Sequence, residues 1–369
     1  MSNLFIACSK MNTKCENIWI NTGGITAITL LLAWLLYFVL DVSVFEKITP
    51  KDSDDNVLRY LYSIENVDTT AIDYDDKIVI FDLKAEKSRK IIAEAILTIE
   101  NAQPKAVILD IIFSDNSETD AYSDSCLQQI VTSFDNIYTA ARIADNNVER
   151  SFFAKGNNVK EGLVNYSSTF CPYEILRNDT LYRMEYAITG LTGKPNSKQC
   201  VNYFNRYFDT LSIKNQYIDS IAKNKIVIVG DLEDLRDRHD MPFCTNGKWR
   251  IQGSELLAYS VSTVLNNSWI VLFPNFVAWI FAAIITFFFV YLSCRLKRWE
   301  RLNDALCNVI IAVLIAVVFI LFLFLCYLIF SAFGKVINPV YTLFALPLTV
   351  ISRDIFDVIC VAWQKIVKK

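Results

Sequence analysis

Four apolar runs divide the chain, and a long polar stretch separates the first run from the other three. The runs cover residues 25–43, 273–293, 306–333 and 336–351, and the polar stretch covers residues 45–270. About 20 apolar residues in a helix cross the hydrocarbon core of a bilayer. Helices satisfy their own backbone hydrogen bonds there. We therefore predict one transmembrane helix before the polar stretch and about three after it.

Two of these runs have alternatives. The fourth is short and contains Pro339 and Pro347, so a re-entrant or interfacial hairpin competes with a full span. The first run is long, and residues 41–43 (DVS) form a poor cleavage site, which favours an uncleaved anchor over a signal peptide. Residues 1–24 are then a cytoplasmic leader, and residues 352–369 a basic cytoplasmic tail.

The basic residues near the apolar runs predict the orientation of the chain. They are Lys10, Lys14, Arg295, Lys297, Arg298, Arg301, Arg353, Lys365, Lys368 and Lys369. Short loops rich in lysine and arginine stay in the cytoplasm. With four spans, both termini and the loop at 294–305 are cytoplasmic, and residues 45–270 lie outside. We expect a multi-pass protein of the bacterial inner membrane, with its large domain in the periplasm.

The polar stretch begins with a pattern that is typical of a strand–helix–strand unit. Residues 77–83 (KIVIFDL) and 106–113 (AVILDIIF) are short β-branched runs, and residues 86–100 between them have apolar positions at helical spacing. Such uniformly apolar strands are buried on both faces, as in parallel sheets. Later segments predict further elements: a helix at 120–134, strands at 137–142 and 225–230, and a helix at 252–265. The predicted fold class is α/β with a mainly parallel sheet.

Composition and charge follow the same division. Hydrophobic residues make up 53% of the chain, above the usual ~45–50% of soluble proteins. Residues 45–270 carry 33 acidic and 25 basic side chains, a net charge of −8, whereas the whole chain carries −3. Phosphate binding needs a basic face. We therefore expect the lipid bilayer as a partner and exclude nucleic acid.

Acidic residues follow three of the predicted strands. Asp82, Asp110 and Asp231 lie at or just past the strand ends, and Asp115 comes shortly after Asp110. Ligands bind at this edge of open parallel sheets, and carboxylates there suit a divalent cation, an amine or a sugar. The alternative is that these acids cap helices and turns. We predict them as candidate residues for an extracytoplasmic ligand.

The sole histidine lies in a second acidic segment. His239 is flanked by Asp237 and Asp240, so its imidazole is placed to titrate near neutral pH and act as a sensor. A solvated loop residue is the alternative. We include all three residues among the candidate ligand contacts.

Motifs of catalysis are missing from the sequence. It contains no GxSxG, HExxH or CxxC motif and no glycine-rich phosphate loop. We predict no catalytic residues, no metal site, no cofactor and no enzymatic activity. Cys126, Cys171, Cys200 and Cys244 lie in the exported stretch, where four cysteines allow three disulfide pairings.

The order of these features resembles the second type of CHASE domain, a sensing extracellular domain associated with cyclases and histidine kinases. The resemblance is carried by residues 77–82, 106–115 (AVILDIIFSD), 161–165 (EGLVN) with Arg183, and 225–265. It extends through the three-helix tail. The family's tryptophan-proline-arginine stretch is replaced here by residues 85–90.

The resemblance implies a sensor that passes an external signal across the membrane, and it implies a homo-oligomer. Because 18 residues follow the fourth run, we expect a separate cytoplasmic or membrane partner to supply the output. A structural or interaction subunit of a cell-envelope complex is the alternative. An exported hydrolase that uses a metal at the acidic edge is disfavoured, because the sequence lacks the histidines that most such sites employ. A transporter is disfavoured, since the cores of the last three runs contain no ionisable residue.

Overall fold

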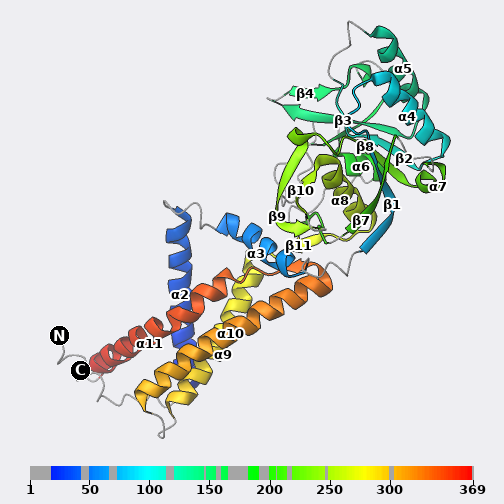
Figure 1. The fold of residues 1–369 in the computed structure, drawn as a ribbon. Coiled ribbons are helices and arrows are strands. Elements are labelled where there is room, and N and C mark those ends of the chain that lie inside the picture. The colour runs from blue at the N-terminus through cyan, green and yellow to red at the C-terminus, as the bar shows by residue number, and fades with distance from the viewer. Residues whose placement is uncertain are drawn as a thin grey trace. The chain divides into compact units, whose positions relative to one another are not determined.

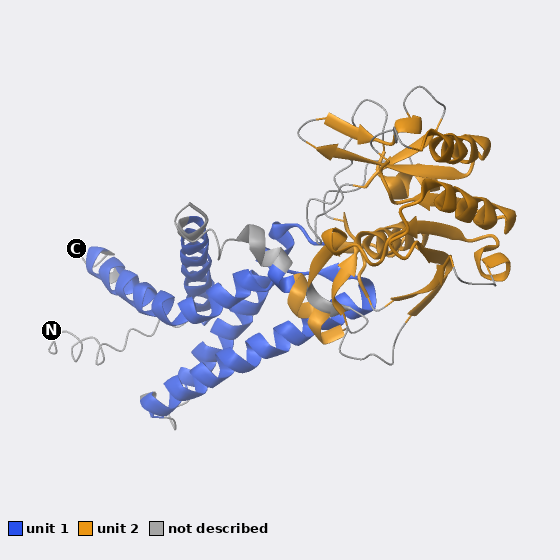
Figure 2. Cartoon of the chain, turned by 45° about the horizontal axis from the view of Figure 1, so that its top comes forward, with its two compact units in different colours: residues 1–57, 272–369 blue, residues 58–271 orange. Residues whose placement is uncertain are grey.

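The computed structural model separates into two compact units, which are shown in different colours in Figure 2 and described here one at a time. One unit contains residues 1–57 and 272–369, and the other contains residues 58–271. The structure describes residues 18–42, 50–65, 73–113, 120–144, 147–154, 159–164, 182–190, 199–204, 206–213, 218–245, 248–298 and 303–367.

A seven-stranded sheet forms the centre of the unit at 58–271 (Figure 1). Its strands are β1 (Asp73–Asp82), β2 (Ala106–Leu109), β3 (Ile137–Ala144), β4 (Asn147–Arg150), β5 (Lys160–Leu163), β7 (Arg206–Ser212) and β8 (Ile226–Gly230). The order is β4-β3-β2-β8-β1-β7, with β5 beside β3. Strand β4 runs antiparallel to β3, and the other neighbouring strands pair in parallel. The sheet is therefore mixed, and the predicted α/β class is confirmed.

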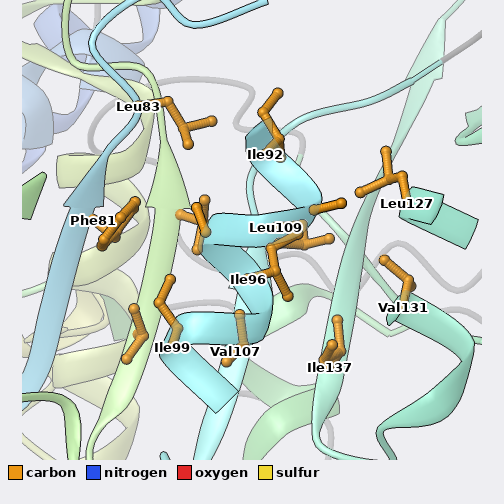
Figure 3. Close-up of a cluster of buried hydrophobic side chains, with 14 of the residues drawn as sticks. Phe81, Leu83, Ile92, Ile96, Ile99, Val107, Leu109, Leu127, Val131 and Ile137 are labelled. Carbon is orange, nitrogen blue, oxygen red and sulfur yellow. The ribbon is translucent and has the colours of Figure 1, made fainter. Parts of the chain in front are cut away.

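Helices cover the sheet on both faces. Helices α4 (Arg89–Asn101), α5 (Ala121–Ser133) and α7 (Ile218–Ala222), with the short η2 (Phe152–Ala154), enclose one hydrophobic core. Figure 3 shows Ile92, Ile96 and Ile99 of α4 in this core, together with Val107 and Leu109 of β2. Alternate residues of β1 face this core, and the residues between them are buried too. Helix α8 (Gly253–Leu265) packs against β1 and β8, and α6 (Met184–Thr189) packs against α8.

Smaller elements surround the sheet. Strands β9 (Arg238–Thr245) and β10 (Lys248–Gln252) form an antiparallel hairpin after the short η3 (Leu235–Asp237). Strand β6 (Gln199–Cys200) pairs antiparallel with β11 (Ile270–Leu272) through Cys200 and Ile270. Helix α3 (Pro50–Glu65) buries Leu58, Leu61 and Tyr62. These elements are irregular in sequence, and the hydrophobic pattern did not predict them.

The other unit contains the long apolar helices. They are α2 (Ile18–Val42), α9 (Asn275–Lys297), α10 (Asp304–Phe333) and α11 (Val340–Val367), with the short β12 (Lys335–Val336) before α11. Among the described residues, three helices are long and apolar enough to cross a membrane: Ile18–Phe38, Asn275–Lys297 and Ala305–Phe333. Helix α2 begins at Ile18 rather than at residue 25, because residues 18–20 (IWI) extend its apolar run.

The fourth predicted run becomes the first part of a longer helix. Helix α11 continues past residue 351 to Val367 and has Pro347 inside it. Arg353, Asp354 and Asp357 interrupt its apolar character, which explains why its composition alone does not qualify it as a span.

Small residues bring α2, α9 and α11 together. Helix α9 buries Ala278, Ala282 and Thr286 at every fourth position. On α2, a Cβ atom added to Gly24 would lie 2.2 Å from the Phe356 ring of α11. Small residues let membrane helices approach closely, where van der Waals contact rather than the hydrophobic effect holds them.

Candidate functional site

Three predicted site residues lie at the carboxyl edge of the sheet. Asp82 ends β1, and Asp110 and Asp231 directly follow β2 and β8. Strand β8 lies between β1 and β2. The backbone NH groups of Leu83 and Asp110 donate to the carbonyls of Gly230 and Val229, both at 2.9 Å. The three acids therefore follow neighbouring strands at one edge, as the sequence predicted.

Asp82 and Asp231 each accept a hydrogen bond from the loop that follows the other residue's strand. Asp82 Oδ1 accepts from the amides of Lys84 at 3.0 Å and Leu232 at 3.1 Å. Asp231 Oδ1 accepts from the amides of Ala85 at 3.2 Å and Glu233 at 2.9 Å. Asp82 also forms a 2.7 Å ion pair with the Lys84 ammonium group. We call this arrangement the reciprocal brace, and it gives both acids a loop-holding role.

Asp110 has a different environment. It is partly buried, and its Oδ2 accepts a 2.7 Å hydrogen bond from Ser254 Oγ in the first turn of α8. A Cβ atom at Gly230 would lie 2.0 Å from that hydroxyl oxygen. Glycine at the end of β8 therefore allows Ser254 to reach Asp110.

Asp237 and His239 lie close enough to Asp110 to interact with it electrostatically. Asp237 Oδ2 accepts from the Gly253 amide at 3.1 Å, and Asp237 Oδ1 lies 3.7 Å from His239 Nε2. The imidazole is 38% exposed and the Asp237 side chain 47% exposed, so both are accessible to a ligand. We call Asp110, Asp237, His239 and Ser254 the edge cluster.

The edge cluster is arranged to change charge near neutral pH. Burial raises the pKa of Asp110 to about 7, with a smaller contribution from the negative charge of Asp237, while the Ser254 hydrogen bond opposes the rise. The hydrogen bond with Asp237 raises the pKa of His239 above its ordinary 6.5, with a further contribution from Asp110. Protonation therefore makes the cluster less negative, and deprotonation leaves two carboxylates beside a neutral imidazole.

The remaining predicted residues are placed elsewhere or not described. Asp240 forms a 2.5 Å ion pair with Arg250 across the β9–β10 hairpin, and both side chains are exposed. Asp115 lies outside the described residues, as does Cys171. Cys126 is a free, partly exposed thiol. Within the ranges that the structure describes, no three His, Cys, Asp or Glu side chains gather as metal ligands do.

Comparison with known families identifies the chain. Residues 26–292 match the CHASE2 domain. The chain belongs to the CHASE2 family. Searches of curated proteins and of solved structures found no match. CHASE2 is a family of sensory extracellular domains, which is consistent with a sensor role for this protein. With three helices of membrane-spanning length and composition, it is a membrane protein.

The CHASE2 domain also contains a buried polar network at the amino edge of its sheet. Asp75 in β1, Arg206 in β7 and Ser262 in α8 are each at most 6% exposed. Ser262 bonds both Asp75 and Arg206, and the Asn266 amide group donates to Asp75 at 3.1 Å. We call these four residues the amino-edge network. Sequence reasoning missed it, because its members are far apart in the chain and its two strand residues lie near strand starts rather than strand ends.

A buried ion pair lies at the start of α6 in the CHASE2 domain. Arg183, which the resemblance singled out, forms a 2.9 Å ion pair with Glu185, and Glu185 is fully buried. Burial raises the pKa of the Glu185 carboxyl, while the Arg183 charge opposes the rise. The pair supports the short helix rather than the candidate ligand edge.

Proposed function

We propose that this protein senses a ligand at the carboxyl edge of its CHASE2 domain, outside the bacterial inner membrane, and signals through a separate partner. The proposal rests on the edge cluster. The residue after β2 and the elements η3, β9 and α8 supply Asp110, Asp237, His239 and Ser254. When deprotonated, this cluster has two carboxylates beside a neutral imidazole, and its negative charge attracts positive groups. The ligand class that fits is a small cation with hydrogen-bond donors, such as an amine.

The membrane helices support a four-span arrangement. The ring of Tyr341, near the start of α11, makes tilted contacts with Tyr37 of α2 at 5.3 Å and with Trp279 of α9 at 4.8 Å between ring centroids. Further along α11, Phe356 contacts Gly24 of α2. Residues 341–356 of α11 thus run beside most of α2, and at ~1.5 Å per residue they extend over about 23 Å. With α11 as a span, the basic ends of the helices fall on one side, in the cytoplasm.

The end of α11 supports a partner for the output. Ile355, Ile359, Trp363 and Ile366 are exposed, the last two by more than 60%. Apolar residues at this spacing form one face of a helix, which a partner helix can cover. A homo-oligomer of the sensor is part of the same proposal, since a second copy offers the same face.

A ligand screen tests the edge cluster. Full-length protein in mild detergent is titrated with amines, divalent cations and sugars while its melting temperature is followed. We expect an amine to raise the melting temperature, and Asp110→Asn to weaken its apparent affinity roughly tenfold or more. Asp219→Asn removes an exposed acid of α7 and serves as the control. Ligands that bind both variants and the parent equally would refute the proposed site.

A second function is favoured by two exposed apolar residues. Leu235 in η3 and Trp249 in β10 are 70% and 62% exposed; η3 contains Asp237, and β10 ends just before Ser254. Exposed aromatic and aliphatic anchors are typical of protein interfaces. The alternative is therefore an envelope subunit that binds another protein here. Photo-crosslinking at Trp249 in intact cells distinguishes the two, because it captures a protein only under this alternative.

A further inference from the structure

A small cavity lies between three helices of the membrane unit. Residues of α9, α10 and α11 line it, among them Ser293, Ile311, Thr349 and Arg353. Its volume is about 10 Å³, which suits one water-sized group such as a single oxygen atom of a larger ligand. The cavity is partly open, so that such a ligand can keep the rest of its atoms outside.

The two polar groups that are available in this cavity are hydrogen-bond donors. Ser293 is 2% exposed, and its hydroxyl has no hydrogen-bond partner among the described residues. Arg353 is partly buried, and its guanidinium donates a 3.9 Å hydrogen bond to the sulfur of Cys294. Thr349 differs, because its hydroxyl donates to the Leu346 carbonyl at 2.5 Å. A buried hydroxyl and a guanidinium together are suited to an anionic oxygen.

The charged groups around the cavity do not neutralise Arg353 directly. In the part of the chain that the structure describes, no carboxylate lies within 4.0 Å of its guanidinium. Asp357, one turn further along α11, interacts electrostatically with both Arg353 and Lys297 from a greater distance, and Asp354 is exposed. On α9, Arg295 and Lys297 add positive charge in the last turn. A partly buried cation without a paired anion is costly.

We propose that the cavity binds a phosphate oxygen of an anionic phospholipid, held by the Arg353 guanidinium and the Ser293 hydroxyl. Arginine matches phosphate geometry with several donors. Basic pockets between helices at the cytoplasmic face bind the headgroups of anionic lipids. The proposal depends on the four-span arrangement, which puts Arg353 and the basic end of α9 at the cytoplasmic headgroups. It is independent of the ligand at the edge cluster.

The test uses the full-length protein after removal of its lipids in detergent. The melting temperature is measured during titration with phosphatidylglycerol, with phosphatidylcholine, and with inorganic phosphate. We expect phosphatidylglycerol to raise it and phosphatidylcholine to do so much less. Arg353→Gln should weaken the apparent affinity for phosphatidylglycerol roughly tenfold or more, and Ser293→Ala should weaken it less. Lys365→Gln, which removes an exposed charge from the same helix, should leave it unchanged.

Any of the following results would overturn the proposal. Equal effects of the two lipids would show that headgroup charge is not recognised. A matching effect of inorganic phosphate at low concentration would assign the cavity to the free anion rather than to lipid. An unchanged affinity in Ser293→Ala and Arg353→Gln would remove the cavity from lipid binding, and Ser293→Ala decides if Arg353→Gln fails to fold. Loss of amine binding in the screen above leaves this result unaffected, so the two proposals fail separately.

Discussion

At the scale of single residues, the number of donors around a carboxylate decides its role at the carboxyl edge. Asp82 is 1% exposed, yet two backbone amides and the Lys84 ammonium group compensate its charge. Asp110 is partly buried and accepts from one hydroxyl. Desolvation therefore remains uncompensated at Asp110 and raises its pKa to about 7. Aspartate therefore stabilises a loop at position 82, whereas at position 110 its charge changes near neutral pH.

The edge cluster makes the stability of the domain depend on pH. Because the folded-state pKa values of Asp110 and His239 are raised, the folded protein binds more protons than the unfolded chain. The free energy of unfolding should then fall as pH rises from about 4 to 7 through Asp110, and further above about 6.5 through His239. Asp110→Asn should flatten the lower part of this profile and stabilise the protein at pH 8 by about 1–3 kcal/mol. Melting temperatures from pH 5 to 8 measure both effects, and an unchanged slope in Asp110→Asn would contradict them.

The reciprocal brace predicts unequal effects of its two acids. Asp82→Ala leaves the amides of Lys84 and Leu232 without their acceptor in a partly buried site, so we expect a loss of about 2–4 kcal/mol. Asp231→Ala removes an acceptor from more exposed amides, which water can replace, and should cost about 1 kcal/mol or less. Chemical denaturation of the two variants measures the difference. Equal losses would mean that burial does not control the strength of the brace.

At the scale of elements, the sequence predicted the parts that follow a simple period. The strands at 77–83 and 225–230 correspond to β1 and β8, and the helix at 252–265 corresponds to α8. Their apolar runs are buried almost completely, which is why hydrophobicity reveals them. Strands β6, β9 and β10 are short or polar, so their pairing depends on distant partners. Ser254 was missed for the same reason, since nothing local links it to Asp110.

Helix α8 connects the two edges of the sheet. Ser254 in its first turn bonds Asp110 in the edge cluster, and Ser262, two turns later, bonds Asp75 in the amino-edge network. The helix is buried along nearly all of its length. Beside its end, Tyr62 of α3 donates to the Val201 carbonyl at 3.3 Å and accepts from the Tyr203 amide at 3.1 Å. Helix α8 therefore reaches from the edge cluster to this segment, where the Asn202 amide donates to Thr263 Oγ1 of α8 at 3.0 Å.

Removing the Tyr62 hydroxyl should loosen this junction. In Tyr62→Phe, the buried Tyr203 amide loses its acceptor, which we expect to cost about 1–3 kcal/mol. Hydrogen exchange at residues 199–204 should accelerate. Tyr60→Phe removes a hydroxyl from a 48% exposed ring of the same helix and should change neither quantity. Equal exchange in both variants would show that the Tyr62 hydrogen bonds do not hold the segment.

The packing of α2 on α11 predicts that a larger side chain is tolerated at Gly23 but not at Gly24. A side chain at Gly24 collides with the Phe356 ring, whereas a Cβ atom at Gly23 meets nothing within 4 Å. Gly24→Leu should therefore destabilise the helix bundle by about 1–3 kcal/mol, as overpacking does, and Gly23→Leu should not. Combining Gly24→Leu with Phe356→Ala should restore stability. Melting temperatures in detergent measure this, and failure of the second change to compensate would place the contact elsewhere.

At the scale of the whole molecule, orientation in the membrane is the feature on which the sensor function depends. Unit 58–271 carries the acidic charge, whereas the membrane helices end in basic residues. Family membership confirms a sensory extracellular domain. The sequence predicted this organisation because apolar runs and basic flanks are local signals.

Labelling of single cysteines tests the orientation. In a background with the native cysteines replaced by serine, Asp219→Cys should react with a membrane-impermeant maleimide in intact spheroplasts. Lys365→Cys should react only after the membrane is broken. The two positions are exposed, on α7 and near the end of α11, so reactivity reports their side of the membrane. Reaction of both positions in intact spheroplasts would exclude four spans.

Pro347 gives α11 a property that its neighbours lack. A proline has no amide hydrogen, so the Leu343 carbonyl one turn earlier loses its helical partner. The helix can bend at that point at less cost than elsewhere. Residues before the proline include Tyr341, whose ring contacts α2 and α9, and residues after it include Arg353 and the exposed Trp363. A small change of angle at Pro347 therefore displaces Trp363, near the end of α11, by more than it displaces residues close to the bend.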